Sequence, residues 1–112
     1  MAHEEVSFDF ELLRELTETN GVPGYEERIR DIVRRELTDE VDTIESDGMG
    51  NLVATVEGTG DQHVVVAAHM DEIGFMVRHV TDDGYLKLDA LGGWDARVLK
   101  AQRVTVHTDE GD

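Results

Sequence analysis

The residues with the clearest chemistry are His69, Asp71 and Glu72, which follow a valine-rich run that starts at His63. Apolar runs rich in β-branched residues are typical of strands buried on both faces of a sheet. Neutral imidazole is a common metal ligand, and a carboxylate two residues away can fix its tautomer and raise its basicity. Open α/β sheets place their sites at the carboxyl ends of strands. The sequence therefore predicts a metal site at the end of a buried strand, and one strand cannot complete it.

Each of these residues also has an ordinary structural explanation. A histidine at a strand end is more commonly hydrogen-bonded within the protein, Asp71 alone fits a turn cap, and Glu72 alone fits a solvated surface acid. His63 lies about 20 Å from His69 along an extended strand, so it cannot bind the same ion. Two further histidines lie in segments of alternating pattern and are predicted to face solvent: His79 and His107.

Composition excludes several other kinds of site. Cysteine is absent, so any metal must be bound through His, Asp, Glu or water. The chain has no phosphate loop, dinucleotide fingerprint, nucleophile elbow or His-Glu-x-x-His helix. No apolar run approaches the roughly 20 residues that span a bilayer, and the amino terminus lacks the pattern of a signal peptide. We therefore expect no membrane association and a cytoplasmic location.

The charge balance is strongly acidic, with 26 acidic residues, 10 basic residues and a formal net charge of -16. Such a surface repels phosphate backbones, so a nucleic-acid partner is not expected. The acids are interleaved with apolar residues, which argues against a disordered acidic chain. An acid-rich, lysine-poor composition is similar to that of proteins from salt-accumulating halophiles, where screening suppresses self-repulsion.

The pattern of elements changes near residue 73. Residues 1–72 are mixed, with predicted helices and strands at 8–19 (with Ser7 as N-cap), 25–37, 41–45 and 52–57, before the buried strand that ends at His69. Residues 73–112 contain only predicted strands, namely a hairpin of 75–80 and 85–88 around an Asp-Gly turn, and a strand at 102–108. We predict two domains, 1–72 and 73–112, and the second has few strands for an independent sheet. With no closing helix after it, the chain has the pattern of a truncated segment.

An ordered series of motifs resembles one family. Residues 67–75, Ala-Ala-His-Met-Asp-Glu-Ile-Gly-Phe, resemble the first metal motif of the M42 glutamyl-aminopeptidase family, whose members form large tetrahedral assemblies. The supporting matches are residues 21–26, residues 47–52, Gly92-Gly93-Trp94 and residues 102–104. The resemblance extends over residues 8 to 108, almost the whole chain.

The resemblance implies an α/β fold, the start of an α/β/α zinc-peptidase-like catalytic domain followed by part of an inserted PDZ-like β-barrel domain. It implies a two-metal site of zinc or cobalt that removes amino-terminal residues from peptide substrates. His69 would ligate one metal, and Asp71, as a catalytic-site residue, would hold the His69 ring. The inserted domain would mediate homo-oligomer contacts. The general base and the other ligands have no counterpart here, so this chain alone is expected to be inactive.

Two other functions remain open from the sequence. One is a non-catalytic acidic relic or assembly module that binds a partner through its β part. The other is a related binuclear deacylase, or a different exopeptidase, that shares only the His-x-Asp pattern.

Overall fold

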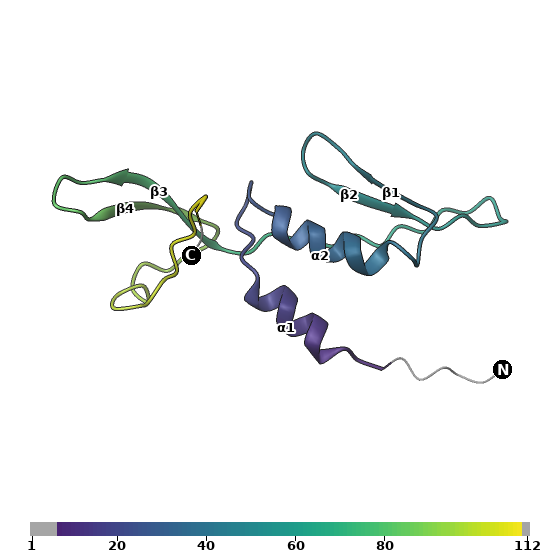
Figure 1. The fold of residues 1–112 in the computed structure, drawn as a ribbon, viewed down its shortest axis with the longest axis horizontal. Helices are drawn as coiled ribbons and strands as arrows, with labels where there is room; N and C mark the ends of the chain where they lie inside the picture. Colours follow the sequence, from purple (N-terminus) through teal and green to yellow (C-terminus); the bar gives the residue numbers. More distant parts are fainter. Residues whose placement is uncertain (1–6, 111–112) are drawn as a thin grey trace.

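The computed structural model describes residues 7–110, which form two helices and two antiparallel hairpins (Figure 1). In chain order the elements are α1 (Phe10–Glu18), α2 (Glu27–Leu37), β1 (Thr43–Ser46), β2 (Leu52–Thr55), β3 (Gly74–Val80) and β4 (Leu86–Leu91). The molecule is elongated, with extents of 64 × 32 × 28 Å. Across the described residues, no helix has the length and apolar character needed to cross a membrane. The fold is thus α/β, as predicted.

The N-cap of the first helix lies two residues later than predicted. Asp9, not Ser7, is the N-cap, and its carboxylate accepts hydrogen bonds from the backbone amides of Glu11 and Leu12, each at 3.0 Å. Aspartate is the stronger cap here because its full negative charge also lies at the positive end of the helix dipole. The prediction of Ser7 was therefore wrong, whereas the helix itself is confirmed.

We expect Asp9→Ala to lower the free energy of unfolding of the α1–α2 region by about 1 kcal/mol, since two amide donors lose their acceptor. Ser7→Ala, two residues earlier, is the matched control and should leave it unchanged. Urea titration followed by helical circular dichroism measures both variants. Equal losses in the two variants would contradict the assignment of the cap.

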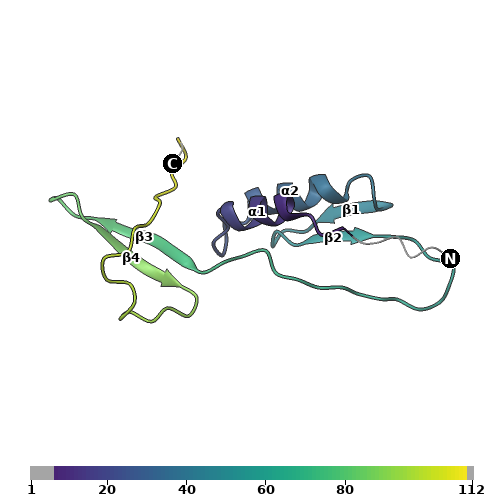
Figure 2. The same ribbon diagram turned by 90° about the horizontal axis from the view of Figure 1, so that it is seen from below.

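The second helix packs on the first hairpin. Ile29 and Ile32, one helical turn apart, are the buried hydrophobic side chains of the described residues, at 6% and 7% exposed. On the same helix, the Arg30 guanidinium donates a hydrogen bond of 2.8 Å to the carbonyl of Gly50, in the turn between β1 and β2. Figure 2 shows both helices on one side of this hairpin. The core is therefore small and lies between α2 and β1–β2.

The turn between β1 and β2 is built around one carboxylate. Asp47 accepts hydrogen bonds from the backbone amide of Met49 at 2.8 Å and from the backbone and side-chain amides of Asn51 at 3.0 and 2.7 Å. The bonds from Asn51, together with those from nearby backbone amides, lower the pKa of Asp47. This confirms the prediction of a turn at 47–51.

The predicted buried strand that ends at His69 is not formed. Residues 62–73 have no regular secondary structure, and Val64, Val65 and Val66 are 89%, 85% and 93% exposed. Figure 2 shows this segment as an extended trace that runs back past the β1–β2 hairpin toward β3. A strand needs a neighbour for its backbone groups and layers for its apolar faces. Within the described residues each hairpin pairs only with itself, so the segment has neither.

The second hairpin, β3–β4, follows the predicted pattern. Its turn closes with a hydrogen bond of 2.9 Å from the amide of Gly84 to the carbonyl of Thr81, and Gly84 takes a positive φ of 83°. The further strand predicted at 102–108 is wrong, because only an isolated bridge residue occurs there, at Thr108. Among the described residues β3 pairs only with β4, and residues 102–107 do not join the open edges of this hairpin. The division of the chain into 1–72 and 73–112 stays a prediction.

Candidate metal site

The structure brings the two predicted site residues, His69 and Asp71, into contact. His69 Nδ1 lies 2.9 Å from the backbone oxygen of Asp71 and 3.1 Å from its Oδ1. Because a carbonyl oxygen only accepts hydrogen bonds, Nδ1 carries the proton and donates it. The lone pair of Nε2 is then the one available to a ligand, on a side chain that is 84% exposed. This is the arrangement in which a carboxylate orients a metal-binding histidine.

The backbone next to these residues is anchored to the turn after α1. The amide of Glu72 donates a short hydrogen bond of 2.7 Å to the carbonyl of Gly21. Glu72 itself is exposed, whereas Met70 and Asp71 are half-buried. The peptide group between Asp71 and Glu72 is therefore fixed through its amide. This hydrogen bond does not fix the exposed carboxylate of Glu72.

The side chains present fit part of a metal site. One imidazole with a free Nε2 and a supporting carboxylate is the chemistry of a single ligand position for a divalent ion such as zinc or cobalt. Between residues 7 and 110 no group of three or more His, Asp or Glu side chains is placed to hold an ion. A catalytic zinc needs about three protein ligands, so these residues supply one edge of such a site.

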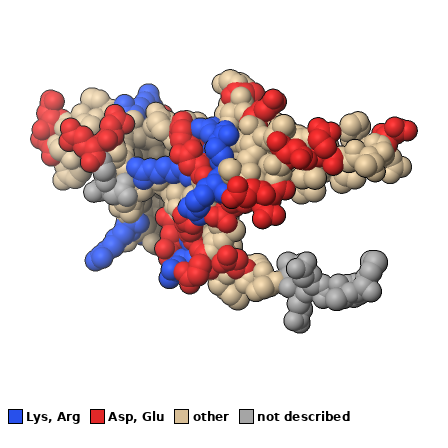
Figure 3. Space-filling view, turned by 45° about the vertical axis from the view of Figure 1, so that its right-hand side comes forward, with Lys and Arg blue, Asp and Glu red and all other residues tan. Residues whose placement is uncertain are grey.

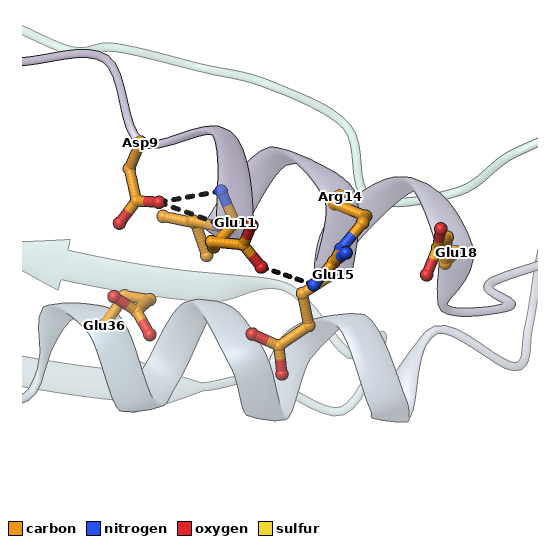
Figure 4. A pocket seen from close by; sticks show the side chains of 7 residues that line it. Asp9, Glu11, Arg14, Glu15, Glu18 and Glu36 are labelled. Atoms are coloured by element: carbon orange, nitrogen blue, oxygen red, sulfur yellow. Dashed lines mark hydrogen bonds and ion pairs between the residues drawn. The ribbon is translucent and has the colours of Figure 1, made fainter.

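Two hollows of the described surface lie away from His69 and Asp71. One of ≈ 440 Å³ lies beside α1 and α2 and is lined mostly by acidic side chains (Figure 4): Asp9, Glu11, Leu12, Arg14, Glu15, Glu18 and Glu36. In Figure 3 acidic side chains are distributed over much of the visible face, with fewer basic ones among them. A second hollow, of ≈ 630 Å³, lies on the β3–β4 hairpin beside Arg78, His79 and Lys87. Neither hollow includes His69 or Asp71, so neither is part of the candidate metal site.

The sequence did not predict the contacts that hold the carboxyl-terminal end of residues 67–75. Trp94 stacks on Phe75, with ring centroids 4.8 Å apart and an interplanar angle of 19°. The indole Nε1 donates a hydrogen bond of 2.9 Å to the carbonyl of Gly74. The signal in the sequence was the Gly92-Gly93-Trp94 loop, whose glycines permit a close approach, but its partner twenty residues earlier is not visible from spacing.

The comparisons with known families match both parts of the chain. The model of the M42 glutamyl aminopeptidase family matches residues 50–112, which is more than half of the chain. A second family model, described as AMPT, matches residues 9–32.

Individual relatives agree with this family. The lysyl aminopeptidase of Pyrococcus furiosus is 42% identical over 105 residues, covering 93% of this chain and 30% of that protein. The glutamyl aminopeptidase of Lactococcus lactis is 35% identical over 104 residues, covering 91% of this chain and 29% of that protein. The chain thus spans about 30% of the length of the curated relatives it matches.

Solved structures share the fold. The TET1 peptidase of Pyrococcus horikoshii, which can assemble into a tetrahedron or a large octahedral shell, matches with a TM-score of 0.82 and 40% identity, covering 90% of this chain and 30% of that one. A TET aminopeptidase from a marine sediment thaumarchaeote matches with a TM-score of 0.85 and 34% identity, covering 90% of this chain and 28% of that one. From the family model, the relatives and the shared fold together, the chain belongs to the M42 glutamyl aminopeptidase family.

Proposed function

We propose that these residues form one part of a binuclear metal-dependent aminopeptidase that removes amino-terminal residues from peptides. The contact between His69 Nδ1 and Asp71 carries the proposal, because it leaves Nε2 directed to solvent as a ligand. Membership of the M42 family supports the aminopeptidase reaction over a deacylase or a non-catalytic module. Since the described residues supply one edge of a metal site, the chain alone is inactive in this proposal.

In this proposal His69 and Asp71 provide one oriented metal ligand, and the other residues of the complete metal site carry out the reaction. When bound, two zinc or cobalt ions would polarise the scissile carbonyl and activate water. His69 contributes one nitrogen ligand through Nε2. Asp71 holds the ring by accepting the hydrogen bond from Nδ1–H, and its negative charge makes Nε2 a stronger electron-pair donor to a metal. The general base and the remaining ligands belong to residues outside this chain.

The finer architecture is also part of the proposal. Residues 1–72 would belong to an α/β/α catalytic domain, and the exposed valines of 64–66 would be covered there by neighbouring strands. Residues 73–112 would belong to an inserted PDZ-like β-barrel domain that mediates homo-oligomer contacts. The high similarity to peptidases that assemble into closed shells supports an oligomer.

We also propose that the acidic surface is adapted to concentrated salt. Raising KCl from 0.1 to 1 M shortens the Debye length from about 10 Å to about 3 Å, so repulsion among the acids weakens. We therefore expect the helical circular dichroism signal of the chain, with its net charge of -16, to increase over this range. A variant with Glu18→Gln, Asp39→Asn and Glu40→Gln should show a smaller increase. An equal increase in the helical signal of the parent and the variant would show that salt acts through the apolar surface and not by screening the acids.

A chimera tests the proposed function directly. This chain replaces the matching segment of the Pyrococcus furiosus lysyl aminopeptidase, to which it is 42% identical. The chimera should bind two metal ions per subunit and cleave an amino-terminal residue from a short peptide, whereas the 112-residue chain alone should do neither. A folded chimera that lacks both activities, or an active 112-residue chain, would contradict the proposal.

A further inference from the structure

The segment that leaves the metal motif is packed tightly against the turn after α1. Gly21 is buried, and a Cβ there would lie 2.7 Å from Ile29 Cγ1 and 3.4 Å from the carbonyl oxygen of Met70. The Glu72 amide hydrogen bond to the Gly21 carbonyl, at 2.7 Å, lies at the same place. The backbone on this side of the motif therefore has little freedom to move.

A second set of contacts holds the other side, where β3 begins. A Cβ on Gly74 would lie 2.3 Å from Val22 Cγ1, and a Cβ on Gly92 would lie 2.3 Å from Ile73 Cγ2. Gly92 also takes a φ of 89°, which side chains other than glycine rarely adopt. The backbone around residues 73 and 74 thus lies between the turn after α1 and the loop after β4.

Trp94 adds a polar contact and an aromatic contact to this second set. Its indole donates to the Gly74 carbonyl at 2.9 Å, and its ring stacks on Phe75 at 4.8 Å. The side chain is half-buried, in a chain that buries few large side chains. Gly74 is three residues from Asp71, so the residues that Trp94 contacts and the carboxylate that contacts His69 share one short stretch of backbone.

We propose that Trp94 is a positioning residue for the metal motif, which acts through Gly74 and Phe75 to keep Asp71 against His69 Nδ1. The contacts of Trp94 are with Gly74 and Phe75, so in this proposal its effect passes through the backbone of residues 70–75. This inference rests on the proposed role of His69 as a metal ligand. In this inference the loop after β4, which contains Trp94, helps to position His69 and Asp71 just before β3.

The test uses three variants of the chimera and of the 112-residue chain. Trp94→Ala removes both the indole donor and the stacked ring, whereas Trp94→Phe keeps a stacked ring without the donor. Tyr85→Ala is the control, because it truncates an aromatic residue that is 73% exposed in the turn between β3 and β4. Cobalt titration of the chimera gives metal affinity, and hydrogen exchange of the chain reports on residues 70–76. We expect Trp94→Ala to weaken cobalt binding at least fivefold and to accelerate exchange at the Glu72 amide. Trp94→Phe should lie between it and the parent, and Tyr85→Ala should match the parent.

A double-variant comparison separates positioning from a general loss of stability. If Trp94 acts through Asp71, then Trp94→Ala should weaken cobalt binding little further once Asp71→Asn is present. Additive losses, or unchanged affinity in Trp94→Ala, would overturn the inference. If the parent chimera binds no cobalt, the proposed function has failed. Hydrogen exchange of the 112-residue chain then still tests whether Trp94 restrains the backbone of residues 70–76. Exchange of residues 70–76 that does not respond to Trp94→Ala would overturn the inference independently.

Discussion

His69→Ala should abolish one of the two metal sites of the chimera and most of its peptidase activity. The reason is that Nε2 of His69 is the only side-chain nitrogen of residues 67–75 available to a metal, because Nδ1–H already donates its hydrogen bond to Asp71. Loss of a residue that merely supports a ligand costs 10–100-fold in metal affinity or activity, so loss of the ligand itself should cost more than about 100-fold in kcat/KM. Peptide hydrolysis at saturating zinc or cobalt measures the effect.

His63→Ala is the matched control for this result. His63 is the same residue type, lies in the same extended segment and is exposed like His69, but it is six residues away. Its removal should leave metal content and activity at the parent level. If both variants lose activity equally, the loss comes from disturbance of the segment, and His69 is not the ligand.

Asp71→Asn should weaken metal binding less than His69→Ala does. The Nδ1 proton is shared between the backbone oxygen of Asp71 at 2.9 Å and its carboxylate at 3.1 Å. The backbone acceptor survives the substitution, so the ring keeps part of its orientation, whereas the negative charge that strengthens the imidazole is lost. We therefore expect a loss near the lower end of the roughly 10–100-fold range, measured by equilibrium cobalt titration of the chimera.

Glu72→Gln removes the neighbouring negative charge and serves as the control for Asp71→Asn. The Glu72 side chain is exposed, and its hydrogen bond to Gly21 is made by the backbone amide, which the substitution preserves. Cobalt affinity should therefore stay within about twofold of the parent. An equal loss in the two variants would show that the general field of the acids, and not the contact with His69, sets the affinity.

The elements that were predictable are those specified by local signals. The apolar spacing that places Ile29 and Ile32 on one face gave α2, and the Asp-Gly step before Tyr85 gave the β3–β4 hairpin. The run at 64–66 failed for a physical reason, because a valine-rich sequence favours a strand only when neighbouring strands and layers are present. The strand predicted at 102–108 failed in the same way. Local pattern predicts the capacity to pair, not the partner.

In the candidate site, too, the local contact was predictable and the contacts between distant residues were not. The contact between His69 and Asp71 was predictable, since residues two apart in an extended chain before a turn can meet by a local bend. The contacts that anchor this pair were not, because Gly21 and Trp94 approach it from about fifty and twenty residues away in sequence. Their glycine and tryptophan motifs were visible as part of a resemblance, but only the fold shows that they enclose the metal motif from both sides.

The most direct test of the central claim is the crystal structure of the zinc-loaded chimera with anomalous scattering from zinc. The claim is that His69 ligates one metal through Nε2 while Asp71 holds Nδ1. The expected result is a zinc peak about 2.0–2.1 Å from His69 Nε2, with the Nδ1 contact to Asp71 retained. Zinc peaks that lie away from His69, or a zinc ion on Nδ1 with Asp71 displaced, would contradict it.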